Sequence, residues 1–345
     1  MVCVDLVEEA GSDRSLRLVA AGYFGEGNLG DDALLAGFRV AAGELGATVI
    51  PLLGPHAQDE HAVARRDFKA IAAAVRDADA LVFPGGSIFQ DVTSWRSPLY
   101  YANVVRVAAN QDKPVVMIGQ GVGPLRSWIG RRVARTAFNQ CRLVGVRDPG
   151  SLETLSGLGV RCRTELGADS ALLLPPARSD ARSGVGLSMR AFGAHDEDLI
   201  APARALIAAL RAAGERVVCL PMDAADRAFA ERLMEGEAGV RMEVCPTPEA
   251  FIELASGLRG MVAMRLHAGI LGALGGCPPI MLSYDPKVTA FADLIQRPWF
   301  DATSYNPDDV ARRIMNPDGT HWRDKFEALR LAARRNIELL REGLA

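Results

Sequence analysis

Residues 260–287, GMVAMRLHAGILGALGGCPPIMLSYDPK, decide the fold prediction. A short apolar run over 261–264 is followed by a stretch with helical spacing and then by a second apolar run over 279–283. This order predicts a strand, a helix and a strand, the repeating unit of a parallel α/β sheet. Ligands of such sheets bind beyond the carboxyl ends of the strands. The residues that follow the two strands are polar and basic, and they predict a pocket for an anion: Arg265, His267 and Lys287.

The same alternation of strands and helices runs through most of the 345 residues, a length typical of about two domains. A stretch rich in proline and small polar residues, 175–183, interrupts it and predicts a linker. We therefore expect two Rossmann-like, doubly wound α/β domains that face a cleft, over residues 14–177 and 178–304. Residues 305–345 read as helices that pack back toward the first domain. Residues 1–13 read as a loosely held extension.

The bulk composition is that of an ordinary globular protein. The net charge of −3 gives no support to nucleic-acid binding, and only four of the 39 basic residues are lysines. The six cysteines form no CxxC motif, and most lie in apolar stretches, which favours a reducing, cytoplasmic compartment. No apolar run reaches the length of about 18 residues that a membrane-spanning helix needs. We expect a cytoplasmic protein that works, at most, peripherally at a membrane surface.

A glycine-rich motif follows the first predicted strand: Gly25, Gly27 and Gly30 spell GxGxxG. A dinucleotide site would also need an acidic residue at the end of the second strand, and the strand over 48–53 has none. Asp31 and Asp32, at the start of the helix, would oppose a pyrophosphate. We favour instead a loop that lets a substrate approach the backbone at Gly30, with Asn28 and Asp31 at its tip.

Other candidate binding residues also follow predicted strands. The turn at Gly85, Gly86 and Ser87 is expected to expose backbone N–H groups to an anion, although a plain tight turn explains it equally well. Gln120 follows the strand over 115–118 within a glycine-rich GQGVG stretch. The cleft is predicted to receive further polar side chains at strand ends on both sides of the linker, namely Arg147, Arg190 and Tyr284.

Eight motifs in order resemble those of the polysaccharide pyruvyl transferases, and most closely the CsaB type of bacterial cell walls. They lie between residues 16 and 296: GYFGEGNLGDDALL, PGGSIFQD, MIGQGVGPL, VGVRDPGSLETLSGLGV, ADSALLL, GLSMR, MRLHAGI and SYDPKV. The resemblance implies a glycosyltransferase-B-like pair of domains. It implies an enzyme that moves pyruvate from phosphoenolpyruvate onto two hydroxyls of a sugar, forming a cyclic ketal and releasing phosphate. By motif, it assigns phosphoenolpyruvate to Arg147, His267 and Lys287.

The chemistry agrees with the cations. Phosphoenolpyruvate carries about three negative charges on a small frame, so its site needs several cations and backbone donors. We expect Arg147, Arg265 and Lys287 to hold its phosphate and carboxylate. His267 is the candidate acid, because imidazole exchanges protons near neutral pH, or it is a cationic phosphate ligand. Asp31 or Asp169 is the candidate base for the sugar hydroxyl. We expect neither a metal ion nor a cofactor.

Two other functions compete with this interpretation. A nucleotide-sugar glycosyltransferase on the same fold would also need cations, for a diphosphate. A noncatalytic sugar-binding protein fits poorly with so many cations at strand ends. If the resemblance holds, the acceptor is N-acetylmannosamine in a lipid-linked precursor of a cell-wall polysaccharide, whose pyruvate is recognised by surface-layer domains. The sequence gives no indication of the oligomeric state.

Overall fold

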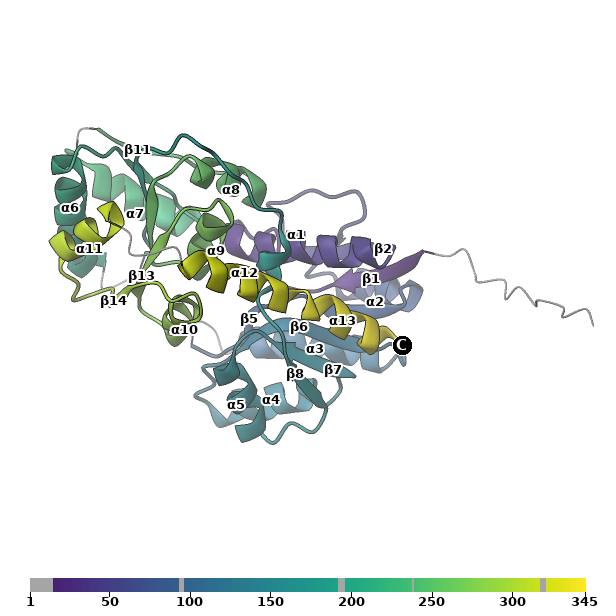
Figure 1. Cartoon of the computed structure of the whole chain (residues 1–345). Helices are drawn as coiled ribbons and strands as arrows, with labels where there is room; N and C mark the ends of the chain where they lie inside the picture. The colour runs from purple at the N-terminus through teal and green to yellow at the C-terminus, as the bar shows by residue number, and fades with distance from the viewer. Residues whose placement is uncertain (1–14, 93–95, 192–195, 238, 317–320) are drawn as a thin grey trace, which may run out of the picture.

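A computed structural model describes residues 15–92, 96–191, 196–237, 239–316 and 321–345. The extension expected over residues 1–13 lies outside these ranges. The described chain forms two parallel β-sheets with helices on their faces, one sheet from each half of the sequence (Figure 1). The predicted fold class, α/β with two doubly wound halves, is confirmed.

The first sheet has the strand order β3-β2-β1-β4-β6-β7-β8, and β5 pairs with β6. Its strands are β1 (Leu16–Ala20), β2 (Ala47–Leu53), β3 (Val63–Ala64), β4 (Ala80–Phe83), β5 (Gly86–Phe89), β6 (Val115–Val122), β7 (Leu143–Val146) and β8 (Arg163–Leu166). The helices that connect and follow them are α1 (Leu29–Glu44), α2 (Phe68–Asp77), α3 (Arg96–Ala109), α4 (Trp128–Phe138), α5 (Pro149–Gly157) and the short 3₁₀ helix η1 (Ser170–Leu173).

The second sheet has the order β11-β10-β9-β12-β13-β14. Its strands are β9 (Val185–Ser188), β10 (Val217–Cys219), β11 (Val240–Met242), β12 (Gly260–Ala263), β13 (Pro279–Ser283) and β14 (Trp299–Asp301). Its helices are α6 (Asp196–Ala212), α7 (Ala224–Met234), α8 (Pro248–Ser256), α9 (Leu266–Leu274), α10 (Pro286–Leu294) and α11 (Pro307–Met315). The order of both sheets reverses beside the first strand of each half, which is where ligand crevices form in open α/β sheets.

The last two helices are drawn in yellow in Figure 1. The final helix, α13 (Arg335–Leu344), packs on β6 and β7 of the first sheet, and α12 (His321–Ala333), before it, packs on η1 and α10. Leu339 and Leu340 of α13 are fully buried. The buried amide of Asn336 donates to the backbone oxygen of Ala168 at 2.7 Å. At the end of the chain Glu342 forms an ion pair with Arg163, the first residue of β8, at 2.5 Å. The carboxyl end of the chain therefore belongs structurally to the first half.

Glycine-rich strand ends were the main error of the sequence-based prediction. The GQGV stretch was expected to be a loop after the strand over 115–118, but it continues β6 to Val122. Gly86 and Ser87 were expected in an open turn, but they begin β5, where Gly86 pairs with Gln120. The low β-propensity of glycine hides both segments in the sequence. The short elements β3, α10 and β14 were also missed.

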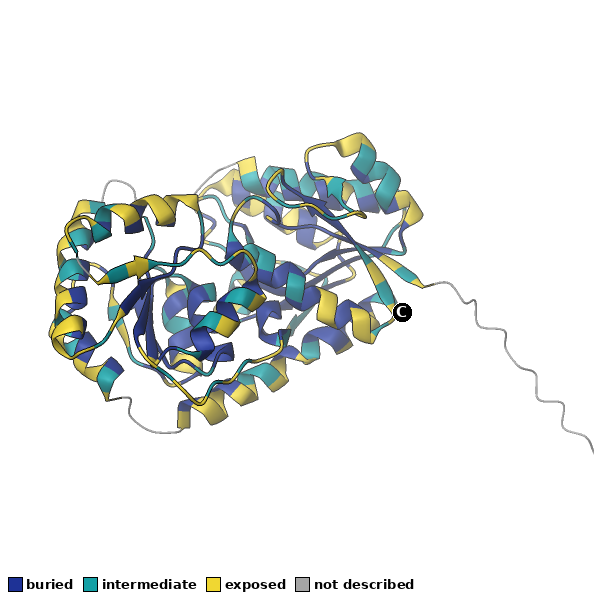
Figure 2. Ribbon diagram, turned by 90° about the horizontal axis from the view of Figure 1, so that it is seen from above, coloured by how far each residue is buried: buried dark blue, intermediate teal, exposed yellow. Residues whose placement is uncertain are grey.

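One hydrophobic cluster is shared by the two halves, and each half also has a cluster of its own. A single cluster of buried residues joins Leu34 and Phe38 of α1 to Phe251 of α8 and Leu271 of α9. Figure 2 shows buried residues along both sheets and on the inner faces of the helices between them. At the start of α1, the backbone N–H of Leu29 donates to the carbonyl of Met222, in the second half, at 2.9 Å. The amino end of α1 is therefore held against both halves.

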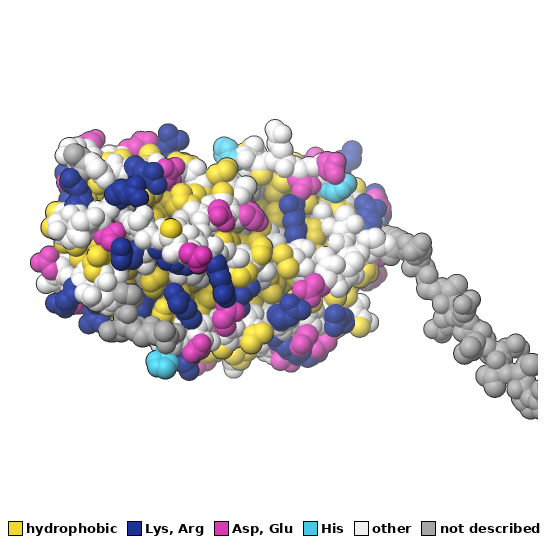
Figure 3. Space-filling model, turned by 45° about the horizontal axis from the view of Figure 1, so that its top comes forward, with side chains coloured by type: hydrophobic (Ala, Val, Ile, Leu, Met, Phe, Trp, Pro, Cys, Tyr) yellow, Lys and Arg dark blue, Asp and Glu magenta, His cyan; other side chains and the backbone are white. Residues whose placement is uncertain are grey.

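The surface is charged and mixed. Figure 3 shows basic and acidic side chains interspersed over one face of the molecule. The cysteines that the structure describes are free thiols: Cys141, Cys162, Cys219, Cys245 and Cys277. Within the described ranges, no helix has both the length and the apolar character that crossing a membrane requires.

Candidate active site

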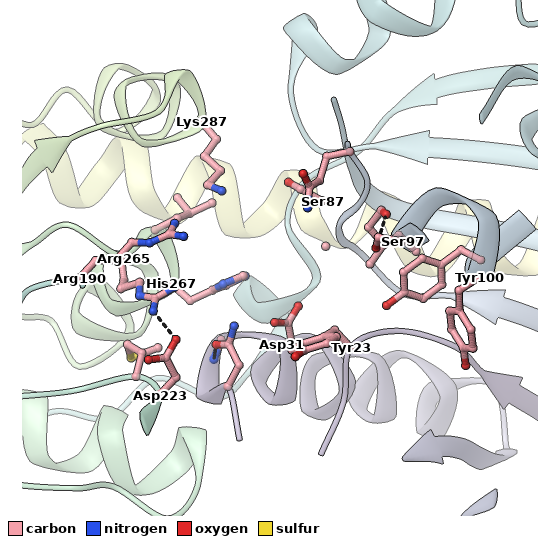
Figure 4. Close-up of a pocket in the computed structure, with 18 of the residues that line it drawn as sticks. Tyr23, Asp31, Ser87, Ser97, Tyr100, Arg190, Asp223, Arg265, His267 and Lys287 are labelled. Carbon is pink, nitrogen blue, oxygen red and sulfur yellow. Dashed lines mark hydrogen bonds and ion pairs between the residues drawn. The ribbon is translucent and has the colours of Figure 1, made fainter. Parts of the chain in front are cut away.

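A pocket of about 830 Å³ lies between the carboxyl ends of the two sheets. Figure 4 shows side chains from both halves pointing into it. Its lining includes seven cations besides one histidine, against two aspartates, so its electrostatic character favours an anion. The charged side chains are Arg65, Arg66, Arg96, Arg147, Arg190, Arg265, Lys287, His267, Asp31 and Asp223.

Asp169 brings together the predicted residues of the two halves. One of its carboxylate oxygens, Oδ2, accepts a hydrogen bond from Arg147 Nη1 at 3.0 Å and lies 3.5 Å from His267 Nε2. A second nitrogen of the Arg147 guanidinium, Nη2, donates to Ser87 Oγ at 3.0 Å. Arg147 comes from the end of β7 and His267 from the first turn of α9, residues 120 apart in sequence but joined here through one carboxylate.

The environment of Asp169 keeps it ionised. Burial disfavours the charge, but His267, Arg147 and the backbone N–H of Ala171 together lower the pKa of Asp169 to about 2. A carboxylate with so low a pKa is a poor base at neutral pH. Of the two candidate bases, Asp169 is therefore better suited to orienting Arg147 and His267 than to accepting a proton.

Glycine at two positions makes room for this arrangement. A Cβ atom on Gly121 would lie 2.7 Å from both Arg147 Nη2 and Ser87 Oγ, so only glycine permits their hydrogen bond. A Cβ atom on Gly30 would lie 2.5 Å from Nδ1 of His267. The third glycine of the GxGxxG motif thus supports the close approach of α1 to the imidazole rather than to a nucleotide.

Replacing Gly30 by alanine is expected to lower turnover about 10²-fold, because the methyl group displaces His267 and a shift of about 1 Å at a reacting group has that cost. The matched control is Gly43→Ala in the same helix, where an added Cβ meets no atom within 4 Å. Gly43→Ala should keep full activity. Steady-state kinetics of both variants test this, and equal activity of the two would contradict the proposed contact.

Asp31 and Asp32 have different roles. Asp32 Oδ1 accepts a hydrogen bond from the backbone N–H of Gly25 at 2.8 Å and so holds the glycine-rich loop. Asp31 instead lines the pocket. Burial raises the pKa of Asp31 to about 6, although His267, Lys287 and Arg265 oppose the shift. A carboxyl group with a pKa near neutrality can exchange protons with a substrate.

Arg265 is held in ion pairs with two aspartates and is therefore not a free cation. Its Nε and Nη2 donate to the two carboxylate oxygens of Asp226, each at 2.7 Å, and Nη2 also pairs with Asp223. Asp226 is almost fully buried and also accepts from the backbone N–H groups of Ala191 and Met222. Arg265 lines the pocket, but two carboxylates already balance its charge.

Arg190 and Lys287 form the least compensated cations of the second half. Arg190 Nη1 donates to the hydroxyl of Tyr284 at 2.5 Å, and its guanidinium carbon lies 4.7 Å from the centroid of that ring. Lys287 Nζ lies 3.5 Å from a carboxylate oxygen of Asp285, which also caps α10 by accepting from the backbone N–H of Lys287. Asp285 therefore positions Lys287 at the start of α10.

The remaining predicted residues divide into two groups. Asn28, Gly30, Gly86 and Ser87 line the pocket, and the side chain of Asn28 also caps α1 by accepting from the backbone N–H of Gly30. Gly85 and Gln120 do not line it. The amide of Gln120 is fully buried and donates to the carbonyl of Phe83 at 3.0 Å. Gln120 therefore lies apart from the pocket, because β6 continues through this residue and its amide packs in the core.

An aromatic and basic wall on the first half was missed by the sequence-based prediction. The guanidinium carbon of Arg65 lies 4.9 Å from the ring centroids of both Tyr23 and Tyr100. Arg65 also forms an ion pair with Glu26 at 2.8 Å and donates to the hydroxyl of Tyr101 at 3.1 Å. The chain has only five tyrosines, and four of them line this pocket. The scarcity of tyrosine was the sequence signal that could have indicated these residues.

Where the structure describes the chain, no group of three or more His, Cys, Asp or Glu residues is placed to hold a metal ion. The pocket offers cations, hydroxyls and aromatic rings. Such a lining binds and orients an anion and a saccharide through hydrogen bonds, ion pairs and stacking.

The sequence matches the profile of a known family. The family profile described as polysaccharide pyruvyl transferase matches residues 28–286, which is most of the chain. The chain belongs to the polysaccharide pyruvyl transferase family. The family match confirms the resemblance seen in the motifs.

The curated relative that this chain matches is distant. The amylovoran biosynthesis protein AmsJ of Erwinia amylovora is 31% identical over 108 residues, which cover 31% of this chain. The match spans 25% of the length of AmsJ. Shared identity over so short a segment does not extend the activity or substrates of AmsJ to this chain.

Solved structures with a similar architecture include UDP-GlcNAc 2-epimerases. The enzyme of Methanocaldococcus jannaschii has a TM-score of 0.63 at 9% identity, covering 95% of this chain and 100% of its own. The enzyme of Neisseria meningitidis has a TM-score of 0.59 at 12% identity, with the same coverage. These likenesses establish the glycosyltransferase-B-like fold of this chain and carry no information on its substrates.

Proposed function

We propose that this protein transfers pyruvate from phosphoenolpyruvate to a sugar of a lipid-linked cell-wall polysaccharide precursor, forming a cyclic ketal. The observation that carries the proposal is the cluster in which Asp169 joins Arg147 of one half to His267 of the other. It lies in the same pocket as Arg190 and Lys287. Separate cations in a small space suit a substrate that carries a phosphate and a carboxylate.

The donor would bind on the side of the pocket formed by the second half. Arg190 and Lys287 are available for an anion because no carboxylate among the described residues pairs closely with Arg190, and Lys287 has only the contact at 3.5 Å with Asp285. Arg147 would complete the site, held in place by Asp169 and Ser87. We assign Arg265 the task of shaping this wall.

The reaction balances without an oxidant or a metal ion. A proton adds to the methylene carbon of phosphoenolpyruvate, which develops positive charge at C2, and a sugar hydroxyl attacks there. The C2–O bond to phosphate breaks, and a second hydroxyl of the sugar forms the second C–O bond of the ketal. The two hydroxyls lose two protons, of which one replaces the proton added to carbon and the other leaves with hydrogen phosphate.

We assign the acid role to His267 and the base role to Asp31. Asp169 lies beside His267 Nε2 and can stabilise a proton there. The raised pKa of Asp31, about 6, leaves it ionised at neutral pH yet basic enough to accept a proton from a sugar hydroxyl. Gly30 brings Asp31 and His267 close together across the two halves.

Replacing Asp31 by asparagine is expected to remove the acidic limb of the pH profile. In the wild-type protein, kcat/KM should fall as the pH drops through about 6, because burial raises the pKa of Asp31 to about 6. The variant should lose about 10²-fold in turnover or more and show a flat profile over that range. Asp32→Asn serves as the control for charge alone. A limb near pH 6 that persists in Asp31→Asn would contradict the assignment of the base.

The same variant should be more stable than the wild type at neutral pH. Because folding raises the pKa of Asp31 from 3.8 to about 6, the folded state holds the proton more tightly than the unfolded state. Ionisation above pH 6 therefore costs the native state about 3 kcal/mol at about 1.4 kcal/mol per pKa unit. Urea unfolding should show a gain of up to that amount at pH 7, vanishing below about pH 4.

The acceptor would bind along the wall of Tyr23, Tyr100 and Arg65. Tyr23 is 43% exposed while one side of its ring is held by Arg65, so it offers a fixed aromatic surface for a sugar. Arg66 is largely exposed and also lines the pocket, where its guanidinium suits the phosphate of a lipid-linked saccharide. The sugar we propose is N-acetylmannosamine.

Replacing Tyr23 by alanine is expected to raise KM for the saccharide about tenfold, which corresponds to the loss of a stacking contact of about 1.4 kcal/mol. KM for phosphoenolpyruvate should stay unchanged, since Tyr23 lies on the opposite wall from Lys287 (Figure 4). The matched control is Tyr23→Phe, which keeps the ring and should keep the wild-type KM. An equal rise in both KM values would contradict the division of the pocket.

The reaction itself tests the proposed function. Phosphate release is measured from phosphoenolpyruvate with a synthetic lipid-linked disaccharide containing N-acetylmannosamine, and the product is examined by mass spectrometry. We expect phosphate release that depends on the disaccharide and a product heavier by one pyruvate ketal. If UDP-sugar were consumed and phosphoenolpyruvate were not, the protein would be a glycosyltransferase and the proposal would be wrong.

A cytoplasmic location at the inner face of the membrane is part of the proposal. It rests on the donor, on the free thiols of the described cysteines and on the lipid anchor of the acceptor. No metal ion or cofactor takes part in the reaction that we propose.

A further inference from the structure

Helix α4 presents exposed apolar side chains at its start. Trp128 is 73% exposed and Ile129 is 49% exposed, and the side chain of Trp128 is the most exposed of the large apolar side chains described. Val92, 51% exposed, belongs to the neighbouring loop. Large apolar groups gathered at one surface mark an interaction site.

The same helix is strongly basic and lacks acidic neighbours in the sequence. Residues 113–147 contain no Asp or Glu, in a chain that has 42 of them. The exposed basic residues of this segment around the helix are Arg126, Arg131, Arg132 and Arg135. We call these four arginines, with Trp128 and Ile129, the α4 face.

The arginines of the α4 face are uncompensated. Within the described ranges, none of their guanidinium groups forms a hydrogen bond or an ion pair. Some exposed arginines elsewhere are paired with carboxylates, for example Arg334 with Glu44 at 2.8 Å and Arg335 with Glu338 at 2.7 Å. The α4 face therefore carries a local positive charge in a protein whose net charge is −3.

The α4 face begins beside the pocket. The carboxylate of Asp91 accepts from the backbone N–H groups of Arg126 and Ser127, at 2.7 and 2.8 Å, and from the hydroxyl of Ser127. Gln90, the residue before Asp91, lines the pocket. Asp91 therefore fixes the start of α4 to the rim of the pocket on the first half, and Figure 1 shows α4 at the outside of that half.

We propose that the α4 face docks this protein on an anionic lipid bilayer. Arginines near an anionic membrane contribute about 1 kcal/mol each, and aromatic side chains are favoured at the level of the headgroups. Trp128 and Ile129 would enter the headgroup region while the four arginines contact lipid phosphates. Docking of the α4 face would bring the pocket to a lipid-linked acceptor. This role rests on the proposed function, in which the acceptor is lipid-linked.

Nucleic acid is the other polyanion that a basic face could bind. The α4 face favours a membrane, because Trp128 and Ile129 supply apolar surface that a phosphate backbone does not use.

Vesicle flotation tests the proposal with lipid alone, in the absence of donor and acceptor. The full chain is mixed with vesicles of phosphatidylcholine or of phosphatidylcholine and phosphatidylglycerol. We expect binding to the anionic vesicles only, weakened by added salt. Arg131→Ala with Arg132→Ala should lower the partition coefficient about thirtyfold, at about 1 kcal/mol per arginine. Trp128→Ala should lower it about tenfold if about 60 Å² of the ring leaves water.

Matched controls lie on other helices. Leu331→Ala removes an apolar side chain that is 68% exposed on α12, and Arg227→Ala removes an exposed arginine on α7. Both should bind vesicles like the wild type. Equal binding to neutral and anionic vesicles, no effect of the α4 variants, or tight binding to RNA without binding to vesicles would each overturn the proposal. Because no substrate is present, these outcomes are independent of whether phosphoenolpyruvate is the donor.

Discussion

Replacing His267 by glutamine is expected to lower turnover about 10²- to 10⁴-fold, the usual contribution of a general acid. Glutamine is similar in length and can still donate to Asp169, so the fold should be retained. KM for phosphoenolpyruvate should change little, because Arg190 and Lys287 remain. Steady-state kinetics with phosphoenolpyruvate and the saccharide measure the two parameters separately, with His61→Gln as the control at an exposed surface position.

A second substitution separates a proton donor from a positive charge. His267→Lys keeps a cation beside Asp169 but exchanges its proton poorly near neutral pH. If His267 acts only as a phosphate ligand, the lysine variant should recover much of the activity that the glutamine variant loses. If His267 is the acid, as we propose, both variants should be equally slow. Wild-type turnover of His267→Gln would remove this residue from the mechanism.

Replacing Arg147 by methionine is expected to abolish turnover and also to destabilise the protein by about 3–5 kcal/mol, the cost of leaving a buried charge without its partner. Arg147 is 8% exposed, and Asp169, its partner, is 5% exposed. Methionine fills the space of the arginine stem but cannot pair with the carboxylate. Urea unfolding at neutral pH measures the loss of stability, and phosphate release measures the loss of activity.

A double variant tells the two effects of Arg147 apart. Adding Asp169→Asn to Arg147→Met removes the unpaired charge, so most of the stability should return. Activity should remain absent, because the guanidinium that we assign to the donor is still missing. Lys287→Met offers a comparison at a partly exposed cation, where we expect a higher KM for phosphoenolpyruvate without a loss of stability. Recovery of activity in the double variant would show that Arg147 acts only through structure.

The architecture could be read from the sequence because its signals are local. Apolar runs of five or six residues such as 48–53 and 279–283 form strands as predicted, and proline with an Asx or Thr cap marks the starts of α5 and α8. Segments with glycine at their ends gave no such signal. The extension of β6 through Gln120 depends on pairing with β5 and β7, which are distant in the sequence.

The cations of the site could be found from the sequence, but their partners could not. Arg265, His267 and Lys287 follow strands, and the rule that strand ends face a common edge placed them together. The hydrogen bonds that give these cations different roles join residues far apart in the sequence. Arg265, for example, is held by Asp226, 39 positions away. The sequence therefore treats Arg265 and Lys287 alike, whereas the fold neutralises one and leaves the other available.

The wall of Tyr23 and Arg65 shows the same limit. Arg65 follows the two-residue strand β3, which is too short to produce a pattern, and its neighbours Tyr100 and Tyr101 come from α3. Only the folded chain brings these side chains to one surface.

The central claim is that phosphoenolpyruvate binds between the two halves, in contact with Arg147, Arg190, His267 and Lys287. A crystal structure of the protein with phosphoenolpyruvate, in the absence of a saccharide, tests it most directly. We predict a phosphate and a carboxylate within hydrogen-bond distance of Arg190 and Lys287, with the methylene carbon facing His267. Phosphoenolpyruvate bound outside this pocket, or within it but away from these four residues, would contradict the account.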